Sequence, residues 1–337
     1  MKIAYRRVSG KVILAEQDCG SRGSWFEKRR AILEFLKNRG HKIDLVSELS
    51  KNSSKREWQK TVPYSSDEKY DAVIFEFAGL NKVFFEKDLE ETARIAREHT
   101  GLCFFICDDP DLPFLWDVVS KTSRQRWFAL YNAKYPKKVS IGKQPDFVES
   151  LDLPLPVLEV GVLGFMKPQE QSREQLQGKS LVYFGRPNGR EKVLASVLST
   201  PNVGLKIFGK ESDWLSVKEK YGVRIHEPPT QDQRRAWYSQ QLASVVFADE
   251  KHKRFGWRTG RSSHALLAGC PAVVEKSHTA LVEEGCLSFG SGLDLRKLSR
   301  DLKSGPQFRS SLWESSMQQM LQAQKFVLER TLQKVGL

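Results

Sequence analysis

Two arginines flank a short glycine-containing turn in the segment FGRPNGREK, which runs from Phe184 to Lys192. The apolar run before this turn predicts a buried strand, and the pattern after it predicts a helix that starts near Arg190. A helix N-terminus offers unpaired N–H groups and the positive end of the helix dipole, which together suit a phosphate group. Arg186 and Arg190 can both reach one diphosphate there, because each guanidinium is a planar fork of donors. Two solvated arginines are the alternative, and the GK[ST] ending of a Walker loop is absent.

A second glycine-containing loop leads into a predicted helix in the segment RFGWRTGRSSHALLAGCPAVVEK, residues 254–276. Arg258, Arg261 and His264 are spaced by three, so a helical continuation places them near one face. That face begins at a helix N-terminus, which again favours an anion. The loop therefore predicts a second part of the same site, although a lone histidine on such a helix can also be structural.

Two adjacent aspartates follow a third apolar run, in the segment CDDPDLPFLW from Cys107 to Trp116. Asp108 and Asp109 would emerge at the carboxyl end of a buried strand, where α/β proteins place their ligands. A partly desolvated carboxylate there can act as the general base that removes a proton from an acceptor hydroxyl. The alternative is that the aspartates start a turn, because Asp before Pro often does so.

The elements that position these residues alternate between short apolar runs and helical patterns, which is typical of βαβ units on parallel sheets. In the first half, strands are predicted at residues 2–6, 42–47, 71–77, 102–107, 127–131 and 139–141, with helices at 25–38 and 84–99. In the second half, strands are predicted at 180–184, 205–208, 223–225, 243–247 and 271–274, with helices at 191–198, 231–240 and 261–267. The pattern predicts two doubly wound α/β domains.

A proline-rich and then polar stretch, residues 151–179, divides these two halves and is interpreted as the interdomain linker. The expected domains are 1–165 and 175–311. The final helical pattern, 312–335, is long enough to pack back across the first domain, which residues from about 312 to 337 would complete.

The charge of the chain favours a polyanionic partner. Lys and Arg number 54 against 41 Asp and Glu, a net charge of +13, and a basic surface binds phosphates with release of counterions. A charge excess that only aids solubility is the alternative. Two clusters supply the candidate residues for binding such a polyanion, namely Arg22, Lys28, Arg29 and Arg30 in the first and Lys134, Lys137 and Lys138 in the second.

The remaining composition indicates a protein of a reducing compartment. The five cysteines are odd in number and scattered, which favours free thiols. Cys103 and Cys107 lack a second Cys/His pair at zinc spacing, so no metal site is predicted. The first residues do not form a signal peptide, and no window resembles a membrane span. We therefore expect a cytoplasmic protein without membrane contact.

Taken together, these motifs resemble the bacteriophage DNA β-glucosyltransferases, enzymes of the GT-B fold that glucosylate hydroxymethylcytosine in phage DNA. In that family a strand ends in an aspartate, the catalytic base, which two intervening residues separate from the run Leu-Pro-Phe. Asp109 and the run DLPF at 111–114 match this pattern, which favours Asp109 over Asp108, and the aromatic run RWFALYNA at 126–133 also matches. The resemblance spans most of the chain but is weak outside the motifs.

The donor side of the family is matched residue by residue. Its phosphate loop has two arginines four apart, the second followed by Glu, as Arg186, Arg190 and Glu191 are here. The run KIFG, which includes Phe208 and Gly209, resembles the strand and turn beside the nucleotide, and Glu227 and Pro228 fall where backbone groups hold the uracil. Arg261 matches an arginine that contacts the diphosphate. Three residues later the family has a glutamate that accepts hydrogen bonds from the ribose hydroxyls, whereas this chain has His264, which accepts at only one nitrogen when neutral.

The resemblance implies a monomeric, inverting glycosyltransferase with two Rossmann-like domains that face a central cleft. Its donor would be a nucleotide sugar, UDP-glucose, and its acceptor 5-hydroxymethylcytosine or 5-hydroxymethyluracil in double-stranded DNA, with a divalent metal not readable from the sequence. Two alternatives remain: a GT-B enzyme acting on a glycan or another anionic acceptor, and a DNA-binding protein on a GT-B scaffold without catalysis.

Overall fold

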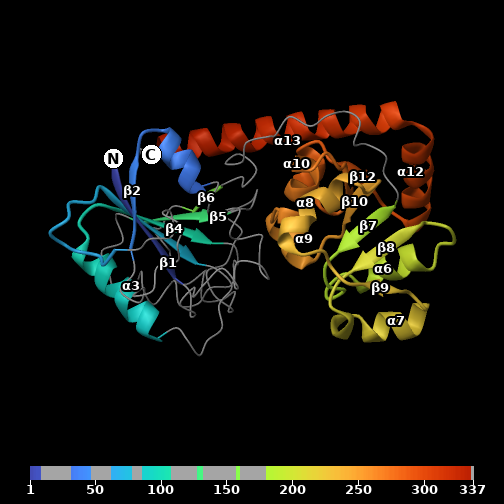
Figure 1. Cartoon of the computed structure of the whole chain (residues 1–337), viewed down its shortest axis with the longest axis horizontal. Coiled ribbons are helices and arrows are strands. Elements are labelled where there is room, and N and C mark those ends of the chain that lie inside the picture. Colours follow the sequence, from blue (N-terminus) through green and yellow to red (C-terminus); the bar gives the residue numbers. More distant parts are fainter. Residues whose placement is uncertain are drawn as a thin grey trace. The chain divides into compact units, whose positions relative to one another are not determined.

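The computed structural model describes residues 1–8, 32–46, 62–77, 86–107, 127–131, 157–159 and 180–334. The chain divides into two compact units, Met1–Val160 and Gly161–Leu337, and each is described by itself (Figure 1). The division falls inside the proline-rich stretch that was interpreted as the linker. The return of the last helix onto the first domain stays a prediction.

The first unit is built on a six-stranded sheet with the strand order β2-β1-β3-β4-β5-β6. Every pair of neighbouring strands is parallel. The strands are β1 (Lys2–Val8), β2 (Lys42–Leu45), β3 (Ala72–Phe77), β4 (Leu102–Cys107), β5 (Trp127–Tyr131) and β6 (Val157–Glu159), and helix α3 spans Glu86–Glu98. Residues 32–38 are also helical. The first five predicted strands are confirmed, whereas the strand predicted at 139–141 lies outside the described residues.

Strand β6 corrects the interpretation of residues 151–179 as a linker. Val157–Glu159 pairs in parallel with β5 and forms the edge of the first sheet. Pro154 and Pro156 precede it in the sequence. Proline is tolerated at the start of an edge strand, because only one side of such a strand is paired. The two prolines therefore do not exclude a strand at this place.

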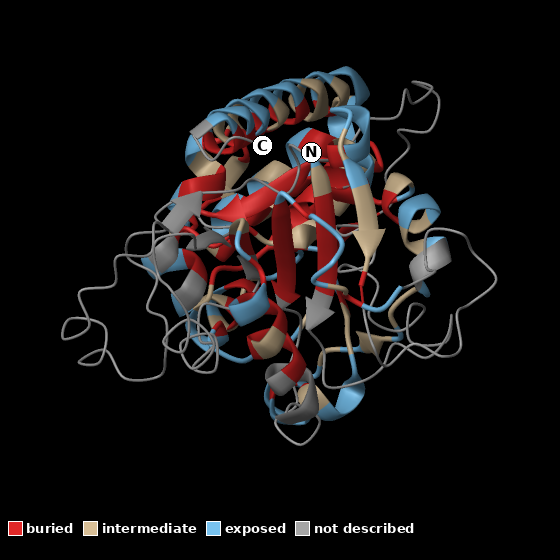
Figure 2. Ribbon diagram, turned by 90° about the vertical axis from the view of Figure 1, so that its left-hand side faces the viewer, coloured by how far each residue is buried: buried red, intermediate tan, exposed pale blue. Residues whose placement is uncertain are grey.

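The central strands of the first sheet form its core. Ile3, Val73, Phe75 and Phe104 are buried, and Figure 2 shows buried residues along the middle strands. Such nearly continuous apolar runs are expected where helices cover both faces of a parallel sheet. Arg6 is a buried exception near the end of β1.

That buried arginine is paired. Its Nε atom donates to the Thr92 hydroxyl over 3.2 Å, and its guanidinium forms an ion pair with Glu91 on α3. Tyr5, also on β1, donates from its hydroxyl to the carboxylate of Glu76 on the neighbouring strand β3 over 2.8 Å. The first sheet therefore carries paired, buried polar groups among the last residues of its central strands.

The second unit has its own six-stranded parallel sheet, with the order β12-β11-β10-β7-β8-β9. The strands are β7 (Leu181–Phe184), β8 (Leu205–Phe208), β9 (Ile225–His226), β10 (Ala243–Val246), β11 (Ala272–Glu275) and β12 (Leu287–Phe289). The helices are α6 (Glu191–Leu198), α7 (Leu215–Tyr221), α8 (Gln231–Ser239), α9 (Glu250–Phe255), α10 (Gly260–Leu267), α11 (Thr279–Glu283), α12 (Gly292–Ser304) and α13 (Pro306–Lys334). The predicted strands and helices of this half are confirmed to within two residues, except that α13 starts six residues before the predicted 312.

The two faces of this sheet are covered by different helices. Leu181 and Tyr183 pack in a core cluster with residues of α6 and α12, whereas Val182 packs with Tyr238 of α8 and Ala265 of α10. This alternation follows from the period of two of a strand. Helices α8 and α10 therefore lie on one face, and their first turns lie near the carboxyl ends of the strands (Figure 1).

The first half of α13 is anchored to the second unit. Met317 and Met320 pack in a core cluster with Leu266 and Leu281. The buried Arg309 donates from Nε to the Leu242 carbonyl over 2.9 Å. These contacts give the long helix a fixed base on the second unit.

Candidate functional site

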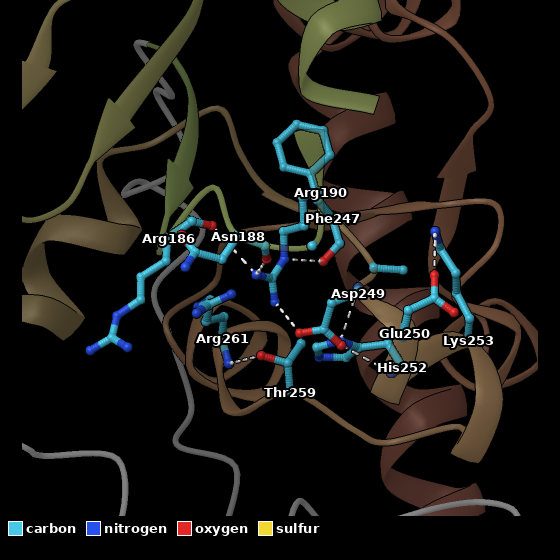
Figure 3. A network of polar contacts seen from close by, with 12 residues as sticks. Arg186, Asn188, Arg190, Phe247, Asp249, Glu250, His252, Lys253, Thr259 and Arg261 are labelled. Carbon is cyan, nitrogen blue, oxygen red and sulfur yellow. Dashed lines mark hydrogen bonds and ion pairs between the residues drawn. The ribbon is translucent and has the colours of Figure 1, made fainter. Parts of the chain in front are cut away.

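The second sheet has a topological switch point between β7 and β10. From β7 the chain runs outward through β8 to β9, and it then returns to β10 and runs the other way through β11 to β12. In open parallel sheets the loops diverge at such a point, and ligands bind there at the carboxyl ends of the strands. Both predicted glycine-containing loops, 184–192 and 254–261, lie at this end of the sheet (Figure 3).

Two glycines pack backbone against backbone at the ends of β7 and β8. The Gly185 N–H donates to the Phe208 carbonyl over 3.0 Å, and the Trp214 indole donates to the Gly185 carbonyl over 2.9 Å. A Cβ atom at Gly209 would lie 2.7 Å from the Gly185 carbonyl oxygen, and one at Gly185 would lie 2.8 Å from Cζ of Arg261. A larger residue would not fit at Gly209, because the atom it would meet belongs to the backbone, and at Gly185 it would displace the Arg261 side chain.

Arg190 joins the loops that follow β7 and β10 (Figure 3). Its side chain is only 7% exposed. The Nε atom donates to the Phe247 carbonyl over 3.2 Å, and a terminal nitrogen donates to Asp249 over 2.6 Å. The other terminal nitrogen reaches the Asn188 and Arg186 carbonyls at 2.9 and 3.4 Å. These contacts use four of the five guanidinium N–H groups, so Arg190 holds the turn in shape, and a contact with a diphosphate would use the remaining one.

Asp249 is the carboxylate that anchors Arg190. It also caps α9, where its Oδ1 accepts from the His252 N–H over 3.2 Å and lies 2.5 Å from His252 Nδ1. Burial opposes ionisation of Asp249, but the hydrogen bond from His252 and the positive charge of Arg190 outweigh it and hold its pKa below the ordinary value. Burial lowers the pKa of His252 and brings that of the neighbouring His278 to about 3. At neutral pH the site thus holds the ion pair of Arg190 and Asp249 next to the neutral imidazoles of His252 and His278.

Arg186, in contrast, extends into solvent. Its side chain is 75% exposed and points away from the network around Arg190 (Figure 3). Its Nε atom lies 3.4 Å from the Asp213 carboxylate. An exposed ion pair of this kind contributes about 0–1 kcal/mol. Arg186 can therefore exchange this partner for a ligand at little cost.

Arg261 lies at the first turn of α10, where the Thr259 side chain caps the helix by accepting from the Arg261 N–H over 3.3 Å. Its guanidinium carbon is 5.9 Å from the centre of the Tyr183 ring, beside Gly185. Among the carboxylates that the structure describes, none forms an ion pair with it. A half-buried cation without an acidic partner, at a helix N-terminus and a switch point, is suited to an anionic ligand.

Arg258 corrects the prediction that it shares a helix face with Arg261 and His264. Helix α10 begins only at Gly260, so Arg258 precedes the helix. Its side chain is 3% exposed, and Nε donates over 2.7 Å to Glu284, which is 4% exposed. Gln324 of α13 donates to the other Glu284 oxygen over 2.9 Å. The charge of Arg258 is thus neutralised by Glu284 in the interior of this unit. Arg258 therefore stabilises the packing of the unit rather than facing the site.

The other predicted nucleotide-binding residues line the β8–β9 side of the edge. Phe208 stacks on His226, with ring centroids 5.1 Å apart, and meets Trp237 of α8 edge to face. Glu227 and Pro228 follow β9 directly, and Glu227 is exposed. His264 lies within α10, one turn after Arg261. The structure thus brings these residues to the same sheet edge as the arginines, and their contact with a nucleoside stays a prediction.

The predicted catalytic and DNA-binding residues lie outside the described residues. They are Asp109 and the basic residues Arg22, Lys28, Arg29, Arg30, Lys134, Lys137 and Lys138. The strand before Asp109, β4, lies between β3 and β5 in the interior of the first sheet.

Two site residues were missed from the sequence. Asp249 follows an apolar strand, as Asp109 does, so the same reasoning about carboxylates at strand ends could have found it. Arg234 lies on α8, with its guanidinium carbon 4.9 Å from the centre of the Phe184 ring. It stands in the polar run QDQRRAW, which shows no motif.

Within the described part of the chain, no three His, Cys, Asp or Glu side chains gather as a metal site. In the same part, no helix is both long and apolar enough to cross a membrane.

The architecture of the two units is that of the GT-B glycosyltransferases, which have two Rossmann-like domains, each with a parallel sheet. In particular, the chain is similar over 99% of its length to T4 phage beta-glucosyltransferase, with 99% of that chain covered, a TM-score of 0.65 and 12% identity. A T4 phage structure of the same enzyme in complex with UDP and Mn2+ gives a TM-score of 0.64 at 13% identity, with both chains fully covered.

A second kind of enzyme shares the fold. The α,α-trehalose 6-phosphate synthase from Burkholderia multivorans matches with a TM-score of 0.51 and 11% identity, over 99% of this chain and 96% of that one. Comparison with protein-family models and with characterised protein sequences finds no match. The similarity is thus one of fold, and it confirms the fold class expected from the sequence.

Proposed function

We propose that the protein is an inverting glycosyltransferase that moves glucose from UDP-glucose to the hydroxymethyl group of a modified pyrimidine in double-stranded DNA. The observation that carries this proposal is Arg261, which has no acidic partner among the described residues and lies against the bare backbone of Gly185 at the switch point of the second sheet. The full-length similarity in fold to a DNA-modifying beta-glucosyltransferase whose substrate is uridine diphosphoglucose supports the donor and the acceptor.

The donor would lie along the carboxyl edge of the second sheet. The loop after β9 and the residues Phe208 and Gly209 would hold the nucleoside, and Arg261 and Arg186 would bind the diphosphate. Charge grows on the diphosphate as its bond to the sugar breaks, and preorganised cations stabilise that charge in the transition state. Arg190 would contribute chiefly by holding the turn, because most of its donors are used within the protein.

The acceptor would be activated by Asp109. The hydroxymethyl oxygen attacks the anomeric carbon, its proton passes to the Asp109 carboxylate, and the bond from that carbon to the diphosphate oxygen breaks, which releases UDP. The attack from the face opposite the leaving group inverts the configuration. A base within a duplex must leave the stack to be reached, and the net charge of +13 suits the binding of a duplex.

A sugar or sugar phosphate as acceptor is the second candidate, because a trehalose 6-phosphate synthase shares the fold. The two candidates are separated by one assay. The purified chain is incubated with UDP-, GDP- and dTDP-sugars, with and without Mn2+, and with duplexes that contain hydroxymethylcytosine, hydroxymethyluracil or unmodified bases, or with glucose 6-phosphate.

Mass spectrometry of the digested nucleosides should show a gain of one hexose on a hydroxymethylated base only. A hexose on glucose 6-phosphate, with none on DNA, would replace the proposal by the second candidate. Binding of DNA without any transfer from any donor would indicate a non-catalytic protein.

A further inference from the structure

Helix α8 carries an arginine at the same sheet edge as Arg261. The Arg234 guanidinium lies over the ring of Phe184, the last residue of β7, at 4.9 Å from Cζ to the ring centre. Its Nε atom is buried, and none of the described residues accepts a hydrogen bond from it. Nor does any carboxylate in the described ranges form an ion pair with Arg234. A buried N–H without an acceptor in the protein is costly, and an anionic ligand can supply that acceptor.

Arg234 and Arg261 both contact residues at the end of β7. Arg261 lies against Tyr183 and Gly185, and Arg234 lies against Phe184 between them. Both positive charges act on the buried hydroxyl of Tyr238: burial raises the pKa of Tyr238 to about 12, and the two arginines oppose this rise. Tyr238 stands four residues after Arg234, on the same side of α8. The two guanidinium groups therefore converge on one end of one strand.

The other arginines of this edge differ from these two because each has an acidic partner. The pairs are Arg186 with Asp213, Arg190 with Asp249 and Arg258 with Glu284. Within the described ranges, Arg234 and Arg261 have no acidic partner, and two such cations at one strand end repel each other, the more so as water is excluded. An anion placed between them removes the repulsion and offers acceptors for both forks of donors.

We propose that Arg234 is a phosphate-binding residue and that, together with Arg261, it holds the diphosphate of the nucleotide donor. This inference rests on the proposed function, which places that diphosphate at the end of β7. Arg234 follows the β9–α8 loop, which is expected to hold the base, so it takes the phosphate nearer the nucleoside. Arg261 lies beside Gly185, the residue that precedes Arg186, so it takes the phosphate nearer the sugar.

The test is calorimetric titration of the full chain with UDP, with inorganic pyrophosphate and with uridine, which lacks phosphate. The variants are Arg234→Ala and Arg234→Lys, which keeps the charge but loses the fork. The matched control is Arg235→Ala, which removes the same charge one residue further along α8, where the Arg235 guanidinium reaches the Leu267 carbonyl at 3.3 Å.

Arg234→Ala should weaken UDP and pyrophosphate about ten- to a hundredfold, as expected for loss of a hydrogen-bonded charge. Uridine affinity should stay within about twofold, Arg234→Lys should lie between Ala and wild type, and Arg235→Ala should bind UDP as wild type does. The melting temperature of Arg234→Ala should not fall, because removing one of two unpaired like charges relieves repulsion. A structural arginine would instead lower it.

The inference is overturned if Arg234→Ala binds UDP normally, or if it loses uridine and UDP equally. In those cases wild-type binding of UDP would leave the proposed function standing. If wild type binds UDP, loses it on Arg234→Ala, and yet transfers no sugar to DNA, the phosphate role of Arg234 stands and the proposed acceptor fails. Absence of UDP and pyrophosphate binding in the wild type would overturn both.

Discussion

The ion pair between Arg190 and Asp249 should be worth a measurable share of the stability of the second unit. Replacement of Asp249 by Asn removes the charge but keeps the helix cap, because Asn and Asp are about equally good at an N-cap. Removal of one partner of a fully buried pair costs about 3–5 kcal/mol. Asp249 keeps 24% of its side-chain exposure, so water can partly solvate the arginine left behind. We therefore expect a loss of about 2 kcal/mol, below that range.

Thermal unfolding of the full chain measures this loss. For a unit of this size, about 2 kcal/mol corresponds to a fall in Tm of about 4–8 °C. The control is Glu250→Gln, the next residue on α9, whose side chain is 83% exposed and lies 3.6 Å from Lys253. Its removal should cost less than about 1 kcal/mol. Turnover should also fall for Asp249→Asn, because Arg190 loses the contact that fixes the turn after β7.

The pH dependence of this difference follows from the pKa of Asp249. The folded state holds that pKa below its ordinary value, so the charged form stabilises the fold above the ordinary carboxyl range and this stabilisation is lost as pH falls towards the folded pKa. The difference in Tm between wild type and Asp249→Asn should be constant from about pH 5 to 8 and should narrow below about pH 4. Equal melting temperatures at pH 7, together with unchanged turnover, would refute a structural role for this pair.

Three further outcomes are expected. Asp109→Ala should lower the rate of sugar transfer by about 10²- to 10⁴-fold with UDP binding intact. Asp108→Ala should have a milder effect on this rate, because neighbouring side chains of an extended chain point opposite ways. A stable Asp109→Ala protein of normal activity would exclude Asp109 as the general base. Arg186→Ala should cost about 2–4 kcal/mol of transition-state stabilisation, measured as kcat/KM, at unchanged Tm, and normal turnover would show that this arginine does not reach the diphosphate. Affinity for duplex DNA should fall steeply between about 50 and 200 mM salt, as phosphate neutralisation requires; fluorescence anisotropy that is indifferent to salt would contradict the electrostatic argument.

Most of the fold could be predicted because its strands are nearly continuous apolar runs that end in glycine or polar residues. Strand β4, residues 102–107, and helix α6, residues 191–198, match their predictions to the residue. Several elements were not predicted: β12 is only three residues long, α11, α7 and α9 have five to seven residues, and the longer helix α12 has 13. Strand β6 was missed because its prolines were taken as a sign of a linker.

The site was harder to predict, because sequence spacing does not show which donors are already used. Arg190 and Arg258 have the residue type and position of ligand-binding arginines, yet tertiary partners far along the chain, Asp249 and Glu284, take up their charge. Arg234 has no motif, and only the packing of α8 beside α10 brings it to Phe184. The spacing of the motifs therefore predicted the sheet edge at which these arginines lie. It did not show which of them are held in ion pairs within the protein.

The ion pair between Arg190 and Asp249 also limits when the turn after β7 can reach its final form during folding. Arg190 and Asp249 are 59 residues apart, and the segment between them contains the strands β8, β9 and β10 and the helices α6, α7 and α8. Closing so long a loop carries an entropic cost that only the pairing of β10 with β7 can repay. During synthesis, Arg190 in the turn after β7 has no Asp249 to pair with until β10 and the start of α9 have been made. The turn after β7 is thus completed only after β10 has been made, and a truncated chain that ends before Asp249 would lack this ion pair.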